Sequence, residues 1–511
     1  SIEKFYFAGL PKSCEKIKEH FNDHVITFVG SESMQDVLSL LDLSQDEIPL
    51  SLIQGSEYDD ALMDLSTKFL DSFDPHFKVI KNTNYPEYGT FNDRLSLRLF
   101  YHQQTSDSPL TRLHVGPYHQ DQKQAIKLFK EWCQSLAKSG HLDILSIGTS
   151  QLTQSKFNED WTNLANGGGV PIQTEQDYED IYEISRPLLL RTYSGTNHID
   201  ELAKIHERSI NIAWHAMSLW WFNQLDGRGP NDLLTNLKQS IQALDFIAST
   251  DKPFEPNTPH HFAFRGADDV TYILSAVLAA RLAKKHGIKD FILQVMLNTP
   301  RYTWGIVDLA KARAILELIK PLESESFKVY LQPRAGLDYF SPDETKAKKQ
   351  LAVVSMLMDD IEPHIKNSPP IVHVVSYSEA LYMANPKVMD ESIQITCSAL
   401  ATYRKLKETK QFDQRKYEKW IEMKKDEFVE ETQIILDSIE RHVDDYLSAQ
   451  GFYDIYEAGY LPTPYLWNAT EIFPNAIYFD SKFDNGSTIL VDKNGQKIDA
   501  IKRIEFAEKN C

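Results

Sequence analysis

The feature of this sequence that most constrains its fold is a repeated alternation of short apolar runs with amphipathic stretches between about residues 112 and 408. Runs such as LDILSIGT and IVHVVSY are typical of buried strands, because β-branched side chains fit a pleated surface that is covered on both faces. Eight such runs can be assigned, at residues 112–118, 142–149, 187–193, 213–221, 252–264, 290–297, 327–332 and 371–377. The fourth and fifth have the least regular pattern.

The stretches between these runs carry apolar residues at helical spacing, as in AIKLFKEWCQSLA at 125–137. Two of them are followed by a glycine, Gly140 or Gly287, which suits the left-handed conformation common after a helix C-terminus. Strand followed by helix, repeated in this way, predicts an α/β protein with a parallel sheet. Eight repeats over this span favour a closed (β/α)8 TIM barrel at residues 106–408 over an open doubly wound sheet.

The segments on either side of the predicted barrel have different patterns. Residues 1–105 contain strand-like runs at 4–8, 25–30 and 49–55 separated by helical stretches, which predicts a small α/β domain. Residues 409–511 begin with a long charged helix at 417–448. A hairpin of strands 487–492 and 500–505 is then expected around Lys493, Asn494 and Gly495, so this segment is predicted to be an α+β extension.

The composition limits the cellular compartments and the classes of partner that can be expected for this chain. The chain of 511 residues has 54 Lys and Arg against 73 Asp and Glu, a formal charge of −19, which argues against a nucleic-acid partner. The four cysteines include no closely spaced pair, so neither a disulfide scaffold nor a paired-cysteine zinc site is expected, as suits a reducing compartment. Because no apolar run of about 18 residues and no leader pattern occur, we expect a soluble cytoplasmic protein that does not contact a membrane.

In a barrel of this kind the reactive groups lie where strands run into the following helices. The polar residues at those positions are His114, Tyr118, His119, Gly148 to Gln151, Arg191, Tyr193, Glu255, His260, His261, Asn298, Arg301, Gln332, Arg334, Ser376, Tyr377 and Glu379. Convergence of Arg191, Arg301 and Arg334 on one mouth would suit a carboxylate or phosphate, because the planar guanidinium binds such anions with two parallel hydrogen bonds. The alternative for each arginine is a surface ion pair.

Several common sites are not supported. The histidines are not spaced to place two imidazoles on one helix face and no His-Glu-x-x-His motif occurs, so no metal site is predicted. Neither common glycine-rich nucleotide loop is present in a strand-to-helix context. Trp214, Trp220, Trp221 and Phe222 form an aromatic cluster, for which core packing is the favoured explanation and the wall of a planar cofactor site the alternative.

From about residue 110 to the end, the order of these segments resembles the large (epsilon) chain of glutamate mutase, also called methylaspartate mutase. The resemblance rests on LDILSIGTSQLTQSKFNED at 142–160, PLLLR at 187–191, GADDVTYILSAVLAARLAKKHGIKDF at 266–291 and VDKNG at 491–495. That family consists of adenosylcobalamin-dependent radical carbon-skeleton mutases built on a catalytic barrel. Residues 1–105 have no counterpart in it.

The resemblance implies roles for individual residues. Arg191 corresponds to a substrate-carboxylate arginine, Glu255 to a glutamate lining the active site and Glu379 to the glutamate that contacts the ribose of the adenosyl group. The chain departs from the family at His114 and near Gln154, where two further substrate arginines fall. It also departs in residues 213–221, which lack the glycine-rich loop, and in 371–375, which lack the lysines. A small carboxylate other than glutamate is therefore expected as the substrate.

On this interpretation the expected catalytic residues are Glu255 and His114. Substrate contacts are expected from Arg191, Arg334, Gln154 and Thr149, and cofactor contacts from Glu379, Trp220 and Tyr377. The family's cobalamin-binding signature, Asp-x-His-x-x-Gly, is absent. The resemblance thus implies adenosylcobalamin carried by a separate small subunit, in a hetero-oligomer.

Two alternatives keep the barrel and drop the cobalamin. One is a lyase or isomerase that abstracts a proton beside a carboxylate, with Glu255, His114 or His373 as the base. The other is a non-catalytic barrel that acts as a subunit or binding module, to which the altered loop and the missing lysines also point.

Overall fold

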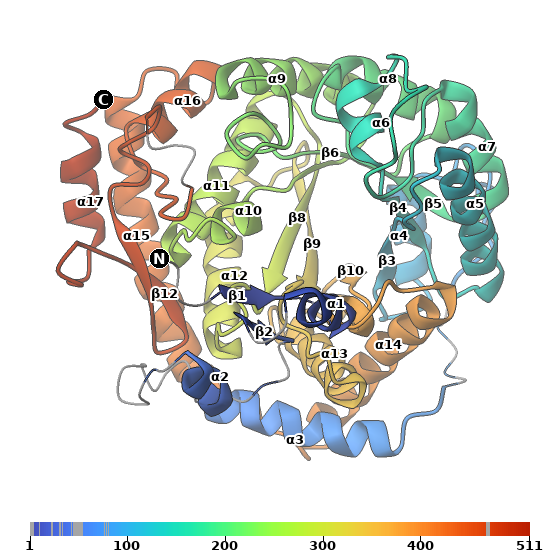
Figure 1. Cartoon of the computed structure of the whole chain (residues 1–511), viewed down its shortest axis with the longest axis horizontal. Coiled ribbons are helices and arrows are strands. Elements are labelled where there is room, and N and C mark those ends of the chain that lie inside the picture. Colours follow the sequence, from blue (N-terminus) through green and yellow to red (C-terminus); the bar gives the residue numbers. More distant parts are fainter. Residues whose placement is uncertain are drawn as a thin grey trace.

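The computed structural model describes residues 5–9, 11–21, 24–29, 32, 34–41, 43, 55–75, 77, 79, 81–466 and 471–511. A single sheet dominates it, surrounded by a ring of helices (Figure 1). The strands of this sheet are β3 (Leu110–Val115), β4 (Ile144–Ile147), β5 (Leu189–Arg191), β6 (His215–Met217), β7 (Phe254–Pro256), β8 (Asp290–Leu297), β9 (Lys328–Ala335) and β10 (Ile371–Val374).

The eight strands are hydrogen-bonded in the order β5-β4-β3-β10-β9-β8-β7-β6, and each neighbouring pair in this order is parallel. The remaining gap between β5 and β6 is bridged by a parallel contact of Tyr193 with Ala216, and the Ala213 N–H donates to the Leu190 carbonyl at 2.7 Å. The sheet is therefore a nearly closed barrel, and the predicted (β/α)8 fold is confirmed.

Helices cover the outside of the barrel after each strand. They are α5 (Gln122–Ser139), α6 (Gln151–Lys156), α7 (Glu175–Ser185), α8 (Ile199–Ile210), α9 (Leu233–Ser249), α10 (Pro259–Ala263), α11 (Asp269–Lys285), α12 (Gly305–Ile319), α13 (Glu344–Asp359) and α14 (Pro386–Glu408), with short 3-10 turns at Lys320–Leu322 and Tyr377–Ala380. Four begin in the same way, because an aspartate precedes the helix and accepts a hydrogen bond from a backbone N–H three residues on: Asp121, Asp232, Asp268 and Asp343.

The two irregular strand predictions are wrong in length. The predicted strand 213–221 is reduced to β6, because Leu219 and then Phe222 adopt positive φ angles of 49° and 68° that turn the chain out of the sheet. The predicted strand 252–264 is reduced to β7, and Pro259 begins the short helix α10 instead.

Two helices that precede the barrel in sequence pack against it. α3 (Glu57–Asp71) lies on α12, α13 and α14, and the Tyr58 hydroxyl donates to Asp360 at 2.6 Å. α4 (Leu95–Gln103) closes the N-terminal end of the barrel, where Leu95 and Leu99 share a buried cluster with the first residues of several strands. The division predicted at residue 105 stays a prediction.

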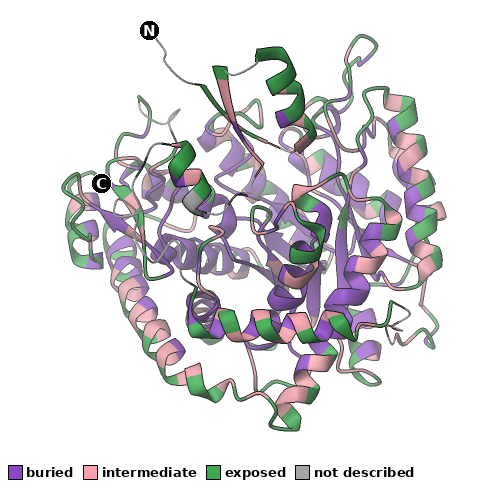
Figure 2. Ribbon diagram, turned by 60° about the horizontal axis from the view of Figure 1, so that its bottom comes forward, coloured by how far each residue is buried: buried purple, intermediate pink, exposed green. Residues whose placement is uncertain are grey.

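The N-terminal residues form a small unit of their own. β1 (Phe5–Ala8) and β2 (Val25–Phe28) pair in parallel. α1 (Pro11–Phe21) lies between them in the sequence, and α2 (Met34–Leu40) follows β2. Several large apolar residues of this unit are exposed (Figure 2), including Phe5 and Phe21. The strand predicted at 49–55 lies outside the described residues apart from Gly55, which is in no strand.

The C-terminal extension packs beside the barrel. It comprises α15 (Arg415–His442), α16 (Ala449–Glu457), β11 (Asp480–Asp484), β12 (Ser487–Val491) and α17 (Ala500–Ala507). The chain turns back at residues 493–495 as predicted, where Val491 forms an antiparallel bridge with Lys497. The predicted second strand is wrong: β12 pairs with β11 across Asn485 and Gly486, and residues 500–507 are helical. The reason is that Asp499 caps the segment, with its side chain accepting from the Lys502 N–H, which starts a helix.

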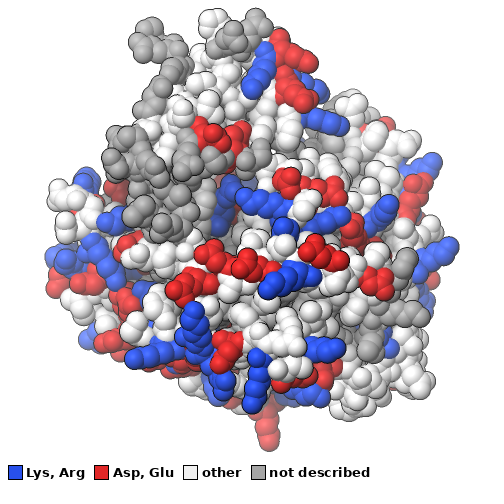
Figure 3. All heavy atoms as spheres, turned by 90° about the horizontal axis from the view of Figure 1, so that it is seen from below, with Lys and Arg blue, Asp and Glu red and all other residues white. Residues whose placement is uncertain are grey.

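The surface shows how the net negative charge is distributed. On the face seen in Figure 3, Lys and Arg are interspersed with Asp and Glu and do not gather into a single basic patch. Among the described residues, no helix combines the length and the apolarity needed to cross a membrane.

Candidate functional site

A cavity of about 770 Å³ opens at the C-terminal ends of the barrel strands. Its walls come from the segments after β3, β4, β5, β6, β7, β9 and β10, and include His114, Thr149, Tyr193, Phe222, Arg334 and Glu379. Parallel strands bring their C-terminal ends to one face of a barrel, which is why residues so far apart in the sequence meet here.

Beneath the cavity, a buried carboxylate is held between two arginines. Glu255 on β7 accepts from Arg112 Nη1 at 3.1 and 3.2 Å and from Arg191 Nη2 at 3.0 Å, and it also accepts from the Trp214 indole N–H. Glu255 and Arg191 have no exposed surface. The two guanidinium groups lower the pKa of Glu255 to about 2 although burial opposes the shift, so this carboxylate stays ionised.

The same interior layer contains neutral polar groups from the neighbouring strands. Arg112 donates from Nε to Ser146 Oγ at 2.7 Å, and from Nη1 to Gln294 at 3.2 Å and to Gln332. The His373 Nδ1 lies 3.1 Å from Gln294 Oε1. A polar layer thus crosses the barrel at the cavity floor, where a typical barrel packs apolar side chains.

Arg334 on β9 faces the cavity, and no carboxylate of the described residues lies within salt-bridge distance of it. Its Nε donates to the Ala335 carbonyl at 3.2 Å, while its two terminal amines donate to no group in the described part of the chain. Burial lowers its pKa, and so does the charge of Arg191. These unused amines leave a planar, charged donor pair aimed at the cavity.

Positive charge exceeds negative charge in this region. Arg112, Arg191 and Arg334 lie near one another, and Glu255 is the buried carboxylate among them. Burial, together with the nearby charges of Arg191 and Arg334, lowers the pKa of Arg112 to about 9, although Glu255 opposes the shift. An anion entering the cavity would relieve this repulsion.

His114 on β3 lies beside these arginines with its ring accessible from the cavity. The close protein surroundings and the charges of Arg191, Arg112 and Arg334 lower its pKa to about 3, so the ring is neutral at pH 7. Gly148 makes room for this ring, because a Cβ at that position would lie 2.6 Å from His114 Nε2.

Three further predicted residues also line the cavity. Gln154 donates from Nε2 to the Thr149 carbonyl at 2.8 Å and to Thr149 Oγ1 at 3.2 Å, which leaves its own side-chain oxygen available. Glu379 follows β10 at the rim, where burial raises its pKa and Arg334 lowers it. Its carboxylate accepts no hydrogen bond from the described residues.

Other predicted residues are placed elsewhere. Arg191 and Glu255 lie below the cavity and do not line it, and Arg301 does not line it either. Trp220 is stacked on Phe452 at 4.3 Å and donates to the Phe452 carbonyl at 3.0 Å, so it packs the core. The Tyr377 hydroxyl donates to Glu391 at 2.7 Å and points away from the cavity.

The sequence interpretation missed Arg112 and Arg228, which line the cavity. Arg112 stands inside the strand LTRLHV, and a charged residue in a buried strand has to be paired. That rule could have identified Arg112. Arg228 lies in the long segment after β6, and no sequence pattern marks it.

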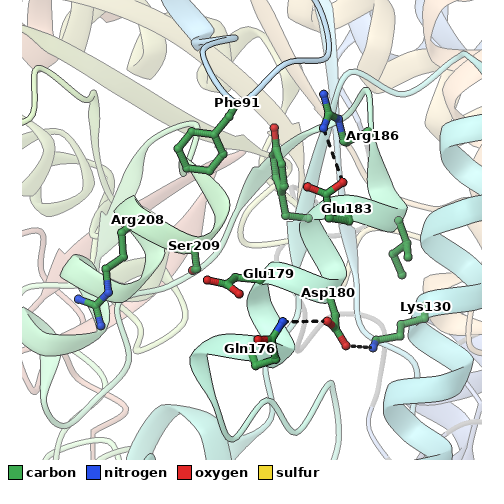
Figure 4. A pocket seen from close by; sticks show the side chains of 11 residues that line it. Phe91, Lys130, Gln176, Glu179, Asp180, Glu183, Arg186, Arg208 and Ser209 are labelled. Carbon is green, nitrogen blue, oxygen red and sulfur yellow. Dashed lines mark hydrogen bonds and ion pairs between the residues drawn. The ribbon is translucent and has the colours of Figure 1, made fainter.

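A second hollow, of about 510 Å³, lies on the outer surface at α7 and α8 (Figure 4). Several of its charged groups are paired: Lys130 lies 2.9 Å from Asp180, and Arg186 lies 3.6 Å from Glu183. Because no strand end reaches this hollow, we regard the barrel mouth as the candidate site.

No group of three or more His, Cys, Asp or Glu side chains in the described ranges is arranged to hold a metal ion. No known protein family matches the chain, and no curated protein matches it in sequence.

Proposed function

We propose that this chain is the large, catalytic subunit of an adenosylcobalamin-dependent mutase that acts on a small carboxylate. The excess of positive charge at the barrel mouth carries the carboxylate part of the proposal. Arg334 offers two unused amines there, and His114 and Arg112 flank the same cavity. The cobalamin part rests on the sequence resemblance and on the lining of the mouth.

A carboxylate in the cavity would accept from the Arg334 amines and from a ring nitrogen of His114. Gln154 and Thr149 would orient an amino or hydroxyl group of the same molecule. Glu255 and Arg191 would act from below as positioning residues, because their ion pairs fix Arg112. A rigid charged floor of this kind holds the substrate in one orientation without reorganising.

The low pKa values of Glu255 and His114 argue against either residue as the general base of a proton abstraction. A general base works best with a pKa near the operating pH. The pKa of Glu255 is lowered to about 2 and that of His114 to about 3, and Glu255 is also shut off from the cavity by its partners. A lyase or isomerase relying on either group as its base is therefore disfavoured, and removal of a hydrogen atom requires no strong base.

Residues at the mouth have the chemistry that the adenosyl end of the cofactor would need. Glu379 at the rim has a free carboxylate that would accept from ribose hydroxyls, and Phe222 and Phe264 provide flat apolar walls. When bound, adenosylcobalamin would supply the radical chemistry needed for hydrogen-atom transfer. The chain's own residues bind the anion, hold its orientation and exclude water from one side. The corrin ring would be held by the partner subunit.

The test is to combine the purified chain with adenosylcobalamin and a small subunit that carries Asp-x-His-x-x-Gly, encoded by a neighbouring reading frame. Small carboxylic acids are then added singly, and the electron paramagnetic resonance spectrum is recorded. We expect a low-spin cobalt signal coupled to an organic radical for the substrate acid. Absence of both the complex and the signal would refute the proposal and favour a non-catalytic barrel.

Two variants make this test specific. Arg334→Gln should abolish the substrate-dependent signal, because it removes the charged donor pair. Arg415→Gln is the matched control, since Arg415 is an exposed arginine at the start of α15 that is paired with Asp413. It should leave both the complex and the signal unchanged.

A further inference from the structure

Another cavity, distinct from the outer hollow at α7 and α8, adjoins the barrel mouth. It has a volume of about 400 Å³ and is lined by Leu225, Asp226, Arg228, His261, Phe264, Arg265, Tyr465 and Leu466. Arg228, His261 and Phe264 also line the mouth, so these three side chains form the boundary between the two spaces. We call this adjoining cavity the side pocket.

A tightly hydrogen-bonded turn after β6 positions the side pocket's charged residues. Asp226 accepts from the backbone N–H of Phe222 at 3.2 Å and from that of Asn223 at 3.0 Å, and the Arg228 N–H donates to the Asn223 carbonyl at 3.0 Å. Gly229 completes the turn, because a Cβ there would lie 2.2 Å from the Phe222 carbonyl oxygen. The turn therefore holds Arg228 at the boundary.

The two arginines of the side pocket differ in how they are satisfied. Arg265 lies over the Trp221 ring and donates to Asp226 at 2.6 Å and to the His261 carbonyl at 2.7 Å, so its charge is neutralised. Arg228 is exposed and stacks on Phe222, with its guanidinium carbon 4.3 Å from the ring centroid. Within the described chain, no carboxylate lies within salt-bridge distance of Arg228.

His261 provides a second unused polar group at the same boundary. Its ring is 5% exposed, and its Nδ1 is buried without a hydrogen-bond partner in the described chain. The ring packs edge-on against Phe222 and Phe264, which fixes its orientation. A buried, unpaired ring nitrogen beside an unpaired guanidinium provides the donors that a ligand oxyanion needs.

We infer that the mouth and the side pocket together bind one extended ligand with an anionic group at each end. Arg334 and His114 hold the first group deep in the barrel, and Arg228 with His261 holds the second, a carboxylate or a phosphate. Phe264 and Tyr465 cover the apolar part near the second group. The inference rests on the anion site of the proposed function and does not depend on cobalamin.

Calorimetric titration without corrinoid tests this with straight-chain monocarboxylates and α,ω-dicarboxylates of four to ten carbons. We expect diacids of one chain length to bind about 10- to 100-fold more tightly than the monoacid of equal length, the range of one charge-assisted contact. Arg228→Gln should abolish that gain and leave monoacid binding unchanged. Arg334→Gln should weaken both, and Arg415→Gln neither.

The outcomes separate this inference from the proposed function. Monoacid binding with no gain for any diacid, or an equal loss of both in Arg228→Gln, would overturn the inference alone. Absence of binding by all acids would overturn the anion site as well. An ω-phosphate analogue of the best diacid that binds more tightly, and depends on Arg228, would identify the second group as a phosphate.

Discussion

Substitution of Glu255 by glutamine tests whether this carboxylate is the counter-ion of the barrel interior. Glu255 accepts from Arg112, Arg191 and Trp214 and has no exposed surface. Its pKa is lowered from 4.5 to about 2, and at 1.36 kcal/mol per unit this contributes about 3 kcal/mol to folding near neutral pH. Glu255→Gln should therefore lower the free energy of unfolding by roughly that amount.

The pH dependence follows from the direction of the shift. A carboxylate whose pKa is lower in the folded state stabilises the fold at pH values above its unfolded-state pKa. This stabilisation is lost as the pH falls and the carboxylate takes up a proton. The difference between wild type and Glu255→Gln should be constant above pH 4.5 and shrink as the pH falls toward about 2. Urea unfolding followed by tryptophan fluorescence at several pH values measures it.

The matched control is Glu183→Gln, because Glu183 is largely exposed and its partner is a surface arginine. This variant should change stability by less than about 0.5 kcal/mol. A Glu255→Gln protein as stable as the control, or a difference that does not vary between pH 5 and pH 3, would refute the counter-ion role.

Three further predictions concern the site and the extension. In a nuclear magnetic resonance titration, His114 should have a pKa of about 3 that rises when a carboxylate binds; an unchanged value would place the anion elsewhere. Gly148→Ala should weaken carboxylate binding in calorimetry, because its Cβ would meet the His114 ring, whereas Gly167→Ala, with no atom within 4 Å, should not. Asp269 accepts from Ser487 at 2.8 Å and pairs with Lys311 at 3.2 Å. Asp269→Asn should therefore destabilise the protein by about 3–5 kcal/mol and speed limited proteolysis of residues 480–499. The control Asp413→Asn, at an exposed position, should show neither effect.

Part of the site could be predicted because barrel topology places strand ends together. Thr149, Gln154, Arg334 and Glu379 end or follow predicted strands, His114 lies within one, and all five line the cavity. Predicting these five residues required only the positions of the strands in the sequence, and not the packing of individual side chains.

The other site residues depended on which way a side chain points. Arg191 lies in the predicted strand 187–193 and ends β5, but it points into the barrel interior toward Glu255, and Trp220 is held in the core by Phe452. Arg228 reaches the mouth through a turn whose positive φ at Phe222 and close approach at Gly229 no periodicity encodes.

The sequence by itself determined the element order and the barrel, because hydrophobic periodicity and capping aspartates act over a few neighbouring residues. The tertiary structure decided the ends of the irregular strands, the true partner of β12 and the charge balance of the mouth. Strand pairing and pKa values depend on groups far apart in the chain. Arg112 and Glu255, for example, are separated by 143 positions and meet only when the barrel closes.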